Sequence, residues 1–183
     1  MNLEEKKISN ERIYSGAILN LDKEKVECPD GSIAYREIVR HHGAACVLAL
    51  TDDGKAIFVS QWREPLRQVT LEVPAGKLET GEDPKQAAIR ELNEEVRIHP
   101  EEIKQVASYY TSPGFADEKM YFFIAKGLKP VEHKRPQDPG EFLRLQYLSL
   151  SEAETQIQAG AISDGKTVNA IWYWKILQLQ GKV

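Results

Sequence analysis

Residues 76–98 read GKLETGEDPKQAAIRELNEEVRI, and this stretch decides how the rest of the chain is interpreted. Within it, Asp83 has the side chain of a helix N-cap, and Pro84 suits the first helical position because its φ is already helical. Strong helix formers follow as far as Val96. The sequence therefore predicts a helix over residues 83–96.

The predicted helix carries three carboxylates on one side. At about 100° per residue, Glu91, Glu94 and Glu95 fall within an arc of about 100°, beside an arc of apolar side chains. Like charges at this spacing repel one another, and the negative end of the helix dipole adds to the repulsion. Gathered carboxylates suit Mg²⁺ or Mn²⁺. Taken alone, however, the pattern is more typical of a solvated glutamate-rich face.

The residues around this helix follow a fixed spacing. Gly76 is followed after five residues by Glu82 and, after seven more, by Arg90. The segment as far as Ile98 resembles the Nudix box, Gly-x5-Glu-x7-Arg-Glu-U-x-Glu-Glu-x-Gly-U, where U is aliphatic. Six specified residues and an aliphatic position at these intervals make the match specific.

The resemblance implies a Nudix fold, in which the box forms a loop, a helix and a second loop beside a mixed sheet. Gly76 is then structural, and Glu82 pairs with Arg90. A divalent cation, Mg²⁺ or alternatively Mn²⁺, would neutralise a pyrophosphate and activate the attacking water. The metal ligands that the resemblance implies are Ala75 through its carbonyl, Glu91, Glu94 and Glu95.

One box position departs from the pattern, because Arg97 stands where the second glycine is expected, although Ile98 keeps the aliphatic position. A glycine just past a helix supplies the left-handed conformation of the cap, which is about 1 kcal/mol less favourable for other residues. We therefore expect a rearranged helix end, with an extra helical turn as one form. A tolerated capping change and an altered metal geometry are the alternatives.

Strand-like runs fill the first 75 residues and return after the helix. Turn sequences at 29–31 and 52–54 fit hairpins. Ser151 and Glu154 have the spacing of a capping box, and apolar residues at helical intervals over 168–179 predict a last helix. This order predicts an α+β fold, and the resemblance specifies a mixed β-sheet sandwiched by helices with an N-terminal antiparallel β-strand region. The predicted strands are 17–26, 33–40, 44–50, 56–63, 69–74, 103–110, 119–126 and 142–149.

Two further stretches, LEVPAGKLE at 71–79 and YTSPGFADE at 110–118, resemble the ADP-ribose pyrophosphatase subfamily. In that subfamily the loop with Ser-Pro-Gly lines the substrate site. Arginine suits a diphosphate because its planar fork pairs with phosphate oxygens. The substrate-binding residues that the resemblance implies are Arg36, Glu37, His41, Arg63, Ser112, Gly114 and Glu118.

The loop before the last predicted strand supplies another acid. Glu141 lies where the subfamily carries a mobile acidic residue that assists hydrolysis, as a general base or by orienting the water. Glu94 is a second candidate for a catalytic role, and which glutamate deprotonates the water stays open. An exposed loop carboxylate is the alternative reading of Glu141.

Composition limits the partners. The balance of 24 basic and 28 acidic side chains offers no general attraction to nucleic acid or to an anionic membrane. Cys28 and Cys46 lie in segments that read as separate strands, with no second pair to build a metal-ligand cluster, and they are expected to be two core thiols. The amino terminus lacks an apolar signal region, and no run reaches the length of a membrane span, so a cytoplasmic location is predicted.

The resemblance covers residues 13–179. We expect an N-terminal strand region at 1–42 that forms a homodimer, and a Nudix hydrolase domain at 43–183. The leading hypothesis is metal-dependent hydrolysis of ADP-ribose, a small nucleoside diphosphate sugar, to AMP and ribose 5-phosphate. Another nucleoside diphosphate sugar or a dinucleotide is the second. A sensor that binds ADP-ribose without cleaving it is the third, and the intact set of box glutamates argues against it.

Overall fold

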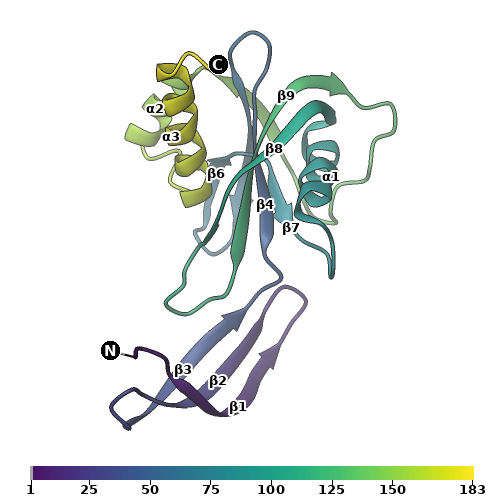
Figure 1. The fold of residues 1–183 in the computed structure, drawn as a ribbon. Helices are drawn as coiled ribbons and strands as arrows, with labels where there is room; N and C mark the ends of the chain where they lie inside the picture. Colours follow the sequence, from purple (N-terminus) through teal and green to yellow (C-terminus); the bar gives the residue numbers. More distant parts are fainter. Residues whose placement is uncertain (1) are drawn as a thin grey trace. The chain divides into compact units, whose positions relative to one another are not determined.

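The computed structural model describes residues 2–183 and divides into two compact units. The first unit comprises Met1–Gly43 and Tyr109–Lys119, and the second comprises Ala44–Ser108 and Met120–Val183. The chain therefore enters the second unit, returns to the first for one short segment, and ends in the second. The colours of Figure 1 follow this path along the chain.

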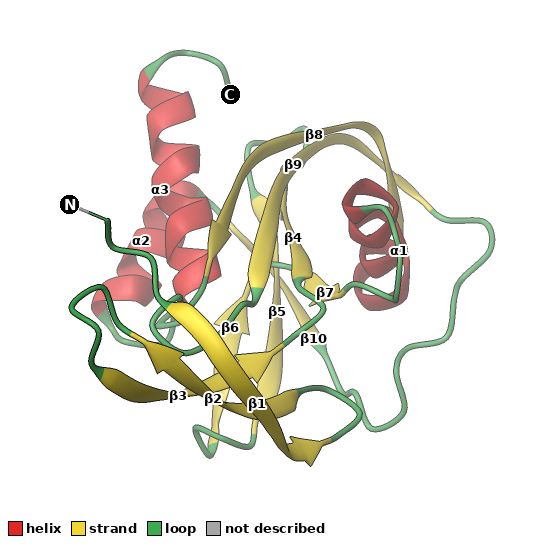
Figure 2. Ribbon diagram, turned by 60° about the horizontal axis from the view of Figure 1, so that its bottom comes forward, coloured by secondary structure: helices red, strands yellow, loops and turns green. Residues whose placement is uncertain are grey.

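The first unit is built on a three-stranded antiparallel sheet (Figure 2). Its strands are β1 (Lys6–Ser15), β2 (Asn20–Glu27) and β3 (Ile33–Arg40), in the order β1-β2-β3. Gly31 adopts a φ of 83° between β2 and β3, as the Pro-Asp-Gly turn sequence predicts. The antiparallel strand region expected at the amino terminus is confirmed.

Strand β1 was not predicted from the sequence. All ten of its residues are exposed, so KKISNERIYS shows no alternation of buried and solvent-facing positions. The strand pairs only with β2 and lies at the edge of its sheet. It exists because of its backbone pairing rather than through burial of its side chains.

The segment that returns to this unit lies beside β3. The Val39 amide donates to the Phe115 carbonyl at 2.7 Å, and the Asp117 amide donates to the Val39 carbonyl at 3.1 Å. Asp117 also accepts a hydrogen bond from the His41 amide at 2.8 Å and forms an ion pair with Arg40 at 3.1 Å. The predicted loop at 111–118 is therefore held against the end of β3.

The second unit contains a mixed sheet of four strands, in the order β7-β4-β9-β8. Strand β4 pairs antiparallel with β7 and parallel with β9. Another sheet has the order β10-β5-β6 and is antiparallel. The strands are β4 (Ala44–Ala49), β5 (Ala56–Arg63), β6 (Gln68–Glu72), β7 (Ala75–Lys77), β8 (Ile98–Tyr110), β9 (Lys119–Pro130) and β10 (Arg144–Leu148).

Three helices cover the second unit: α1 (Pro84–Val96), α2 (Leu150–Gln158) and α3 (Gly165–Leu179). Helix α1 lies on one side of the sheet that holds β4 and β9, and α2 and α3 lie on the other (Figure 1). The core cluster that α1 forms with the strands includes Val47, Ile57, Leu92 and Phe123. Among residues 2–183, none of the helices combines the length and apolar character that a membrane span requires.

Several details of the prediction were wrong. The capping box of α2 is formed by Ser149 and Glu152, not by Ser151 and Glu154, because the helix begins two residues earlier than expected. The run predicted as one strand at 69–74 ends at Glu72, and a separate strand β7 follows.

The two cysteines also differ from the expectation of two core thiols. Cys46 is buried in β4, whereas Cys28 follows the end of β2 and is only half-buried.

Two later strands differ in extent from the prediction: β8 begins at Ile98 instead of residue 103, and β10 begins at Arg144 instead of residue 142. The lengths of strands in this chain thus depend on pairing that local sequence does not specify.

Candidate active site

Helix α1 buries two of the three box glutamates. Its N-cap is Asp83, whose side chain accepts two backbone amides at 3.0 and 3.1 Å, and Pro84 is its first residue. The helix packs against β4 and β7. Glu91 is 9% exposed and Glu95 is 4% exposed, so both share the buried face with Leu92. The carboxylates thus lie under the helix rather than on a solvated face.

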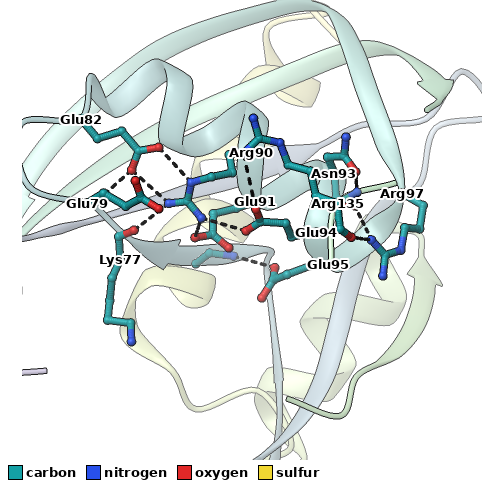
Figure 3. Close-up of polar contacts among 11 residues, drawn as sticks. Lys77, Glu79, Glu82, Arg90, Glu91, Asn93, Glu94, Glu95, Arg97 and Arg135 are labelled. Carbon is teal, nitrogen blue, oxygen red and sulfur yellow. Dashed lines mark hydrogen bonds and ion pairs between the residues drawn. The ribbon is translucent and has the colours of Figure 1, made fainter. Parts of the chain in front are cut away.

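Arg90 binds the acids of the box together (Figure 3). Its Nε and Nη2 donate to the two oxygens of Glu82 at 2.9 and 3.0 Å, and Nη2 also donates to the Lys77 carbonyl at 2.9 Å. Its Nη1 donates to Glu91 Oε1 at 2.7 Å and to Glu94 Oε2 at 2.8 Å. The hydrogen bonds from Arg90 are the main reason that the pKa of Glu82 is lowered. One guanidinium therefore joins the loop before α1 to the acidic face of the helix.

Arg90 does not fully compensate the cost of ionising the buried carboxyls. Burial raises the pKa of Glu91 to about 7, and the charges of Glu94 and Glu141 add to this effect. Burial also raises the pKa of Glu95 well above its usual range, as do the charges of Glu91 and Glu141. A cation placed among these groups would stabilise the ionised forms that burial disfavours.

As they stand, the acids are bound to protein donors. Between residues 2 and 183, no three His, Cys, Asp or Glu side chains are gathered as a set of metal ligands. Arg90 takes one oxygen each of Glu91 and Glu94, and Glu95 Oε2 accepts the Ala75 amide at 3.0 Å. The donor set nevertheless fits a hard divalent cation, because it consists of carboxylate oxygens beside the backbone of β7.

Gly76 makes the room in which one of these acids lies. A Cβ at this position would lie 1.9 Å from Glu91 Oε1, so no other residue fits without moving the carboxylate. Gly76 pairs with Ala45 in the central strand β4, which holds its backbone in place. The sheet and the helix thus form a cradle around the Glu91 carboxylate.

Arg63 is held by a buried ionic network. Its Nε and Nη2 donate to the two oxygens of Glu72 at 2.7 and 2.6 Å, and the Thr70 hydroxyl donates to Glu72 at 2.6 Å. Lys166, at the start of α3, contacts both Glu72 and Asp164. Burial alone would raise the pKa of Glu72, but Arg63, Lys166 and Thr70 outweigh it and bring the pKa to about 2. Glu72 therefore stays ionised and fixes the direction of the Arg63 guanidinium.

The arginine so fixed lies close to the box acids. The charge of Glu95 contributes to raising the pKa of Arg63, although the hydrogen bond to Glu72 is the largest cause. Arg63 in turn acts on Glu141, opposing the rise in the pKa of that carboxyl. Arg63 uses Nε and Nη2 to bind Glu72, and its third guanidinium nitrogen, Nη1, takes no part in that pairing.

The expectation of a rearranged helix end at Arg97 was wrong. Helix α1 ends at Val96, and Arg97 itself takes the left-handed cap conformation, with φ 62° and ψ 34°. Its backbone amide donates to the Asn93 carbonyl at 3.2 Å, as a capping glycine would. Its side chain adds hydrogen bonds to the Asn93 carbonyl at 3.3 Å and to the Arg135 carbonyl. These bonds offset the backbone strain of about 1 kcal/mol that a non-glycine residue bears there.

Glu141 closes a tight turn in the loop that follows β9. Its amide donates to the Asp138 carbonyl at 3.0 Å, and Gly140 has a φ of 84°. Pro139 followed by a glycine with positive φ is the pattern of a type II turn. Burial and the neighbouring Asp138 raise the pKa of Glu141. The predicted catalytic role of Glu141 stays a prediction, but its carboxyl is one that holds a proton more readily than usual.

The first unit contains six of the seven predicted substrate residues, and the second contains Arg63. Arg36 forms an ion pair with Glu5 in which Nε donates at 3.1 Å. Glu37 is exposed, and its Cα partner in β2 is Lys23. Both residues lie on β3, and their predicted contacts with substrate stay predictions.

The other four residues lie at the end of β3 and in the segment beside it. His41 Nδ1 accepts the Gly43 amide at 3.0 Å, so its contact with Glu118 at 3.7 Å is not a charged pair in that tautomer. Ser112 accepts two amides through its carbonyl, which closes a turn over 112–116 that includes Gly114. The structure thus brings His41 and Glu118 together within one unit.

A model of the NUDIX domain matches residues 40–170, which include the whole cradle of acids on α1. The chain belongs to the NUDIX family. A solved structure titled "Crystal structure of ADP compounds hydrolase" has a TM-score of 0.86 and 20% identity, with 100% of each chain covered. This likeness concerns the fold alone, and it confirms the predicted α+β arrangement of the Nudix fold.

Three relatives of this NUDIX chain indicate how close its similarities are. It is 44% identical to an ADP-ribose pyrophosphatase of Bacillus subtilis (strain 168), over 96% of this chain and 95% of the relative. It is 46% identical to a methanol dehydrogenase activator of Bacillus methanolicus, over 97% and 94% of the two chains. It is 33% identical to an ADP-ribose pyrophosphatase of Mycobacterium tuberculosis (strain ATCC 25618 / H37Rv), over 85% and 75%.

The NUDIX box does not include every residue that shapes this site. Glu72 and Lys166 form a buried pair although they are 94 residues apart, and no local pattern links them. An acid inside the apolar strand sequence around Glu72 was the available signal, because a buried carboxylate requires a partner. Arg135 gave no signal, since it lies in a polar loop, yet its Nη1 is 3.7 Å from Glu94 Oε1.

Proposed function

We propose that this chain catalyses the Mg²⁺-dependent hydrolysis of ADP-ribose to AMP and ribose 5-phosphate. The observation that carries the proposal is the buried acidic cradle of α1, in a chain whose relative from Bacillus subtilis, an ADP-ribose pyrophosphatase, is similar over nearly its whole length. The relative from Mycobacterium tuberculosis has the same name at lower identity. These similarities support the substrate, and the acids support the chemistry.

Mg²⁺ is the cation we propose for the cradle, with Mn²⁺ as the alternative. Bound there, it would neutralise the diphosphate and activate the attacking water. The raised pKa values of Glu91 and Glu95 support this assignment, because the protein's own cations do not offset the cost of ionising these carboxyls. The space that Gly76 leaves supports it as well. The ligands we propose are Ala75 through its carbonyl, Glu91, Glu94 and Glu95.

Glu141 is the general base or water-orienting residue in this proposal. A base must have a pKa close enough to the working pH to take up a proton, and burial raises the pKa of Glu141 in that direction. The charge of Glu94 also contributes to the raised pKa of Glu141. Glu94 is the second candidate for the same role.

Arg63 is the residue we propose for the diphosphate. Its side chain is held by Glu72 yet is 39% exposed, so it is both fixed in direction and accessible. A guanidinium whose orientation is already set loses less freedom when it binds a phosphate oxygen. For the residues of the first unit, the roles inferred from the resemblance remain part of the proposal: Arg36, Glu37, His41, Ser112, Gly114 and Glu118.

A homodimer is also part of the proposal, formed through the strand region at 1–42, while residues 43–183 are the hydrolase domain. Strand β1 is an edge strand, and its side chains Ile8, Ile13 and Tyr14 are each at least half exposed. Exposed apolar side chains on an open strand edge favour association. Light scattering on the purified protein tests this: a particle of twice 20.7 kDa is expected. A cytoplasmic location stays a prediction.

The experiment that tests the proposed reaction is product analysis with purified protein. ADP-ribose, GDP-mannose, NADH and 8-oxo-dGTP are each incubated with Mg²⁺ or with a chelator. We expect metal-dependent release of AMP, fastest from ADP-ribose. A faster reaction with another compound overturns the substrate assignment. Tight binding of ADP-ribose without cleavage overturns the enzyme and favours the sensor.

The relative from Bacillus methanolicus is named for activation of another enzyme. That name specifies no chemical step, whereas the acids of the box supply one. Hydrolysis is therefore the function we propose for this chain, and the same substrate panel applies whether or not the chain also acts on another protein.

A further inference from the structure

The residue that breaks the Nudix box, Arg97, forms part of a clamp on the loop that carries Glu141. Asn93, one turn earlier on α1, is the other part (Figure 3). We propose that Asn93 and Arg97 are positioning residues, which hold the start of this loop so that Glu141 reaches the acidic cradle. The proposal rests on the proposed function, because it concerns the place of the proposed base.

Four hydrogen bonds make up the clamp. Asn93 uses both ends of its amide: Nδ2 donates to the His133 carbonyl at 3.0 Å, and Oδ1 accepts the Arg135 amide at 2.9 Å. Arg97 Nη1 donates to the Arg135 carbonyl, and the Val131 amide donates to the Arg97 carbonyl at 3.1 Å. The backbone over 131–135 is thus held to the last turn of α1 and to its cap residue.

Between the clamp and Glu141 the chain has little freedom. Pro136 and Pro139 fix two of the five intervening φ angles, and Gly140 completes the turn whose hydrogen bond joins Glu141 to Asp138. The two prolines and the turn at 138–141 thus limit how far Glu141 can move relative to residue 135.

The far side of Glu141 is anchored as well. Leu143 packs against the core of the second unit, and β10 begins at Arg144. Phe142, between Glu141 and Leu143, is 86% exposed and does not pack into the core. Glu141 therefore lies between two attachments, and in the one before it three of the four hydrogen bonds use the side chains of Asn93 and Arg97.

The clamp also places a cation beside the cradle. Arg135, whose backbone is held at both its amide and its carbonyl, directs Nη1 to within 3.7 Å of Glu94 Oε1. Glu141 is near enough for its charge to act on Glu91 and Glu95. The held loop thus brings two groups to the same set of carboxylates, the Arg135 guanidinium and the Glu141 carboxyl.

Glycine is the informative substitution at Arg97 because it is the residue of the family pattern. If Arg97 only capped the helix, glycine would do so with less backbone strain, and every property would be kept or improved. If Arg97 holds the loop, Arg97→Gly will lower the rate even though the helix end relaxes. The two roles therefore predict opposite results for one variant.

The test compares Arg97→Gly, Arg97→Lys, Asn93→Ala and the wild type, each with Mg²⁺. Lys134→Ala is the matched control, because Lys134 is an exposed cation of the same segment that takes part in none of the four clamp hydrogen bonds. We expect kcat for ADP-ribose to fall about tenfold in Arg97→Gly and Asn93→Ala, with KM changed less than about twofold, because a small misplacement of a reacting group lowers the rate more than it lowers binding. Arg97→Lys, which keeps a donor, should recover part of the loss, and Lys134→Ala should match the wild type.

Hydrogen exchange of the Arg135 and Glu141 amides gives a readout that does not require activity. We expect both amides to exchange faster in Asn93→Ala and Arg97→Gly, while the melting temperature of Arg97→Gly does not fall. Unchanged exchange in both variants overturns the clamp. Faster exchange with unchanged kcat on the best substrate of the wild type overturns the positioning role. If the wild type cleaves no member of the substrate panel, the proposed function fails, and the exchange result still decides whether the clamp exists.

Discussion

The Glu91 carboxylate occupies the volume that a side chain at Gly76 would need. A Cβ built on Gly76 would lie 1.9 Å from Oε1 and 2.0 Å from Cδ of Glu91. The two residues come from different elements, β7 and α1, which pack against each other. The first residue of the Nudix box is thus a glycine because a later residue of the same box requires its space.

Gly76→Ala should therefore damage the metal site more than the fold. The added methyl must push the Glu91 carboxylate out of its cradle, and we expect Mg²⁺ to bind roughly 10–100-fold more weakly, the range found when support of a ligand is lost. Titration with Mn²⁺ or Mg²⁺ followed by calorimetry measures this. Gly165→Ala is the control, since a Cβ there meets nothing within 4 Å. Equal affinities in both variants would contradict the cradle.

Glu91→Gln and Glu95→Gln should abolish most turnover and yet stabilise the metal-free protein. The pKa of Glu91 is raised from 4.5 to about 7, so the fold favours the protonated form and loses stability as pH rises from 4.5 through 7. At pH 8 with a chelator, we expect Glu91→Gln to be about 1–3 kcal/mol more stable than the wild type. Urea unfolding measures this difference.

The order of stability should reverse when Mg²⁺ is added, so that the wild type becomes more stable than Glu91→Gln and Glu95→Gln. The wild type gains stability from a cation bound to charged ligands, whereas each variant has lost one of them. Near-normal metal-dependent turnover in a folded variant would refute the assignment of Glu91 and Glu95 as ligands. A variant that is less stable than the wild type in chelator would refute the electrostatic explanation instead.

Glu72→Gln should destabilise the protein, because it leaves Arg63 and Lys166 without their shared carboxylate. Loss of one partner of a buried ionic network costs about 3 kcal/mol. Glu72 has a pKa lowered from 4.5 to about 2, so its contribution is complete above pH 4.5 and is lost as pH falls toward 2. The difference in unfolding free energy between wild type and variant should therefore shrink over that range. A difference that is independent of pH would contradict the network.

Glu141→Gln should lower kcat with little change in KM, because the residue is proposed to act on water rather than to bind substrate. Burial raises its pKa above 4.5, so the rate of the wild type should fall with decreasing pH earlier than an ordinary carboxylate would allow. The variant should lack that part of the acid limb. Stopped-assay rates across pH at saturating ADP-ribose measure both effects, and an unaltered limb would transfer the role to another acid such as Glu94.

Much of the site was predictable because its chemistry is local. Arg90, Glu91, Glu94 and Glu95 lie within six residues on one helix, so the helical repeat alone brings their side chains to one side. The N-cap at Asp83 was equally local and is confirmed. A pattern read over one helix therefore identified the family and the acids together.

Other features depended on contacts that no local pattern contains. Arg97 was expected to disturb the end of α1, and it does not, because its side chain finds the carbonyl of Arg135, 38 residues away. Strand β1 was missed because all its side chains face solvent and only its pairing with β2 makes it a strand. In both cases a distant partner supplied the stabilisation.

By itself the sequence determined the α+β class, the family, the three glutamates of α1 and the residue at which that helix begins, since these follow from spacing within short segments. Tertiary structure alone decided that Glu91 and Glu95 are buried, that Glu72 holds Arg63 with help from Lys166, and that Arg97 holds a loop. The physical reason is that burial and pKa depend on which groups from distant parts of the chain surround a carboxylate. Spacing places a charge on a helix, and packing decides what that charge can do.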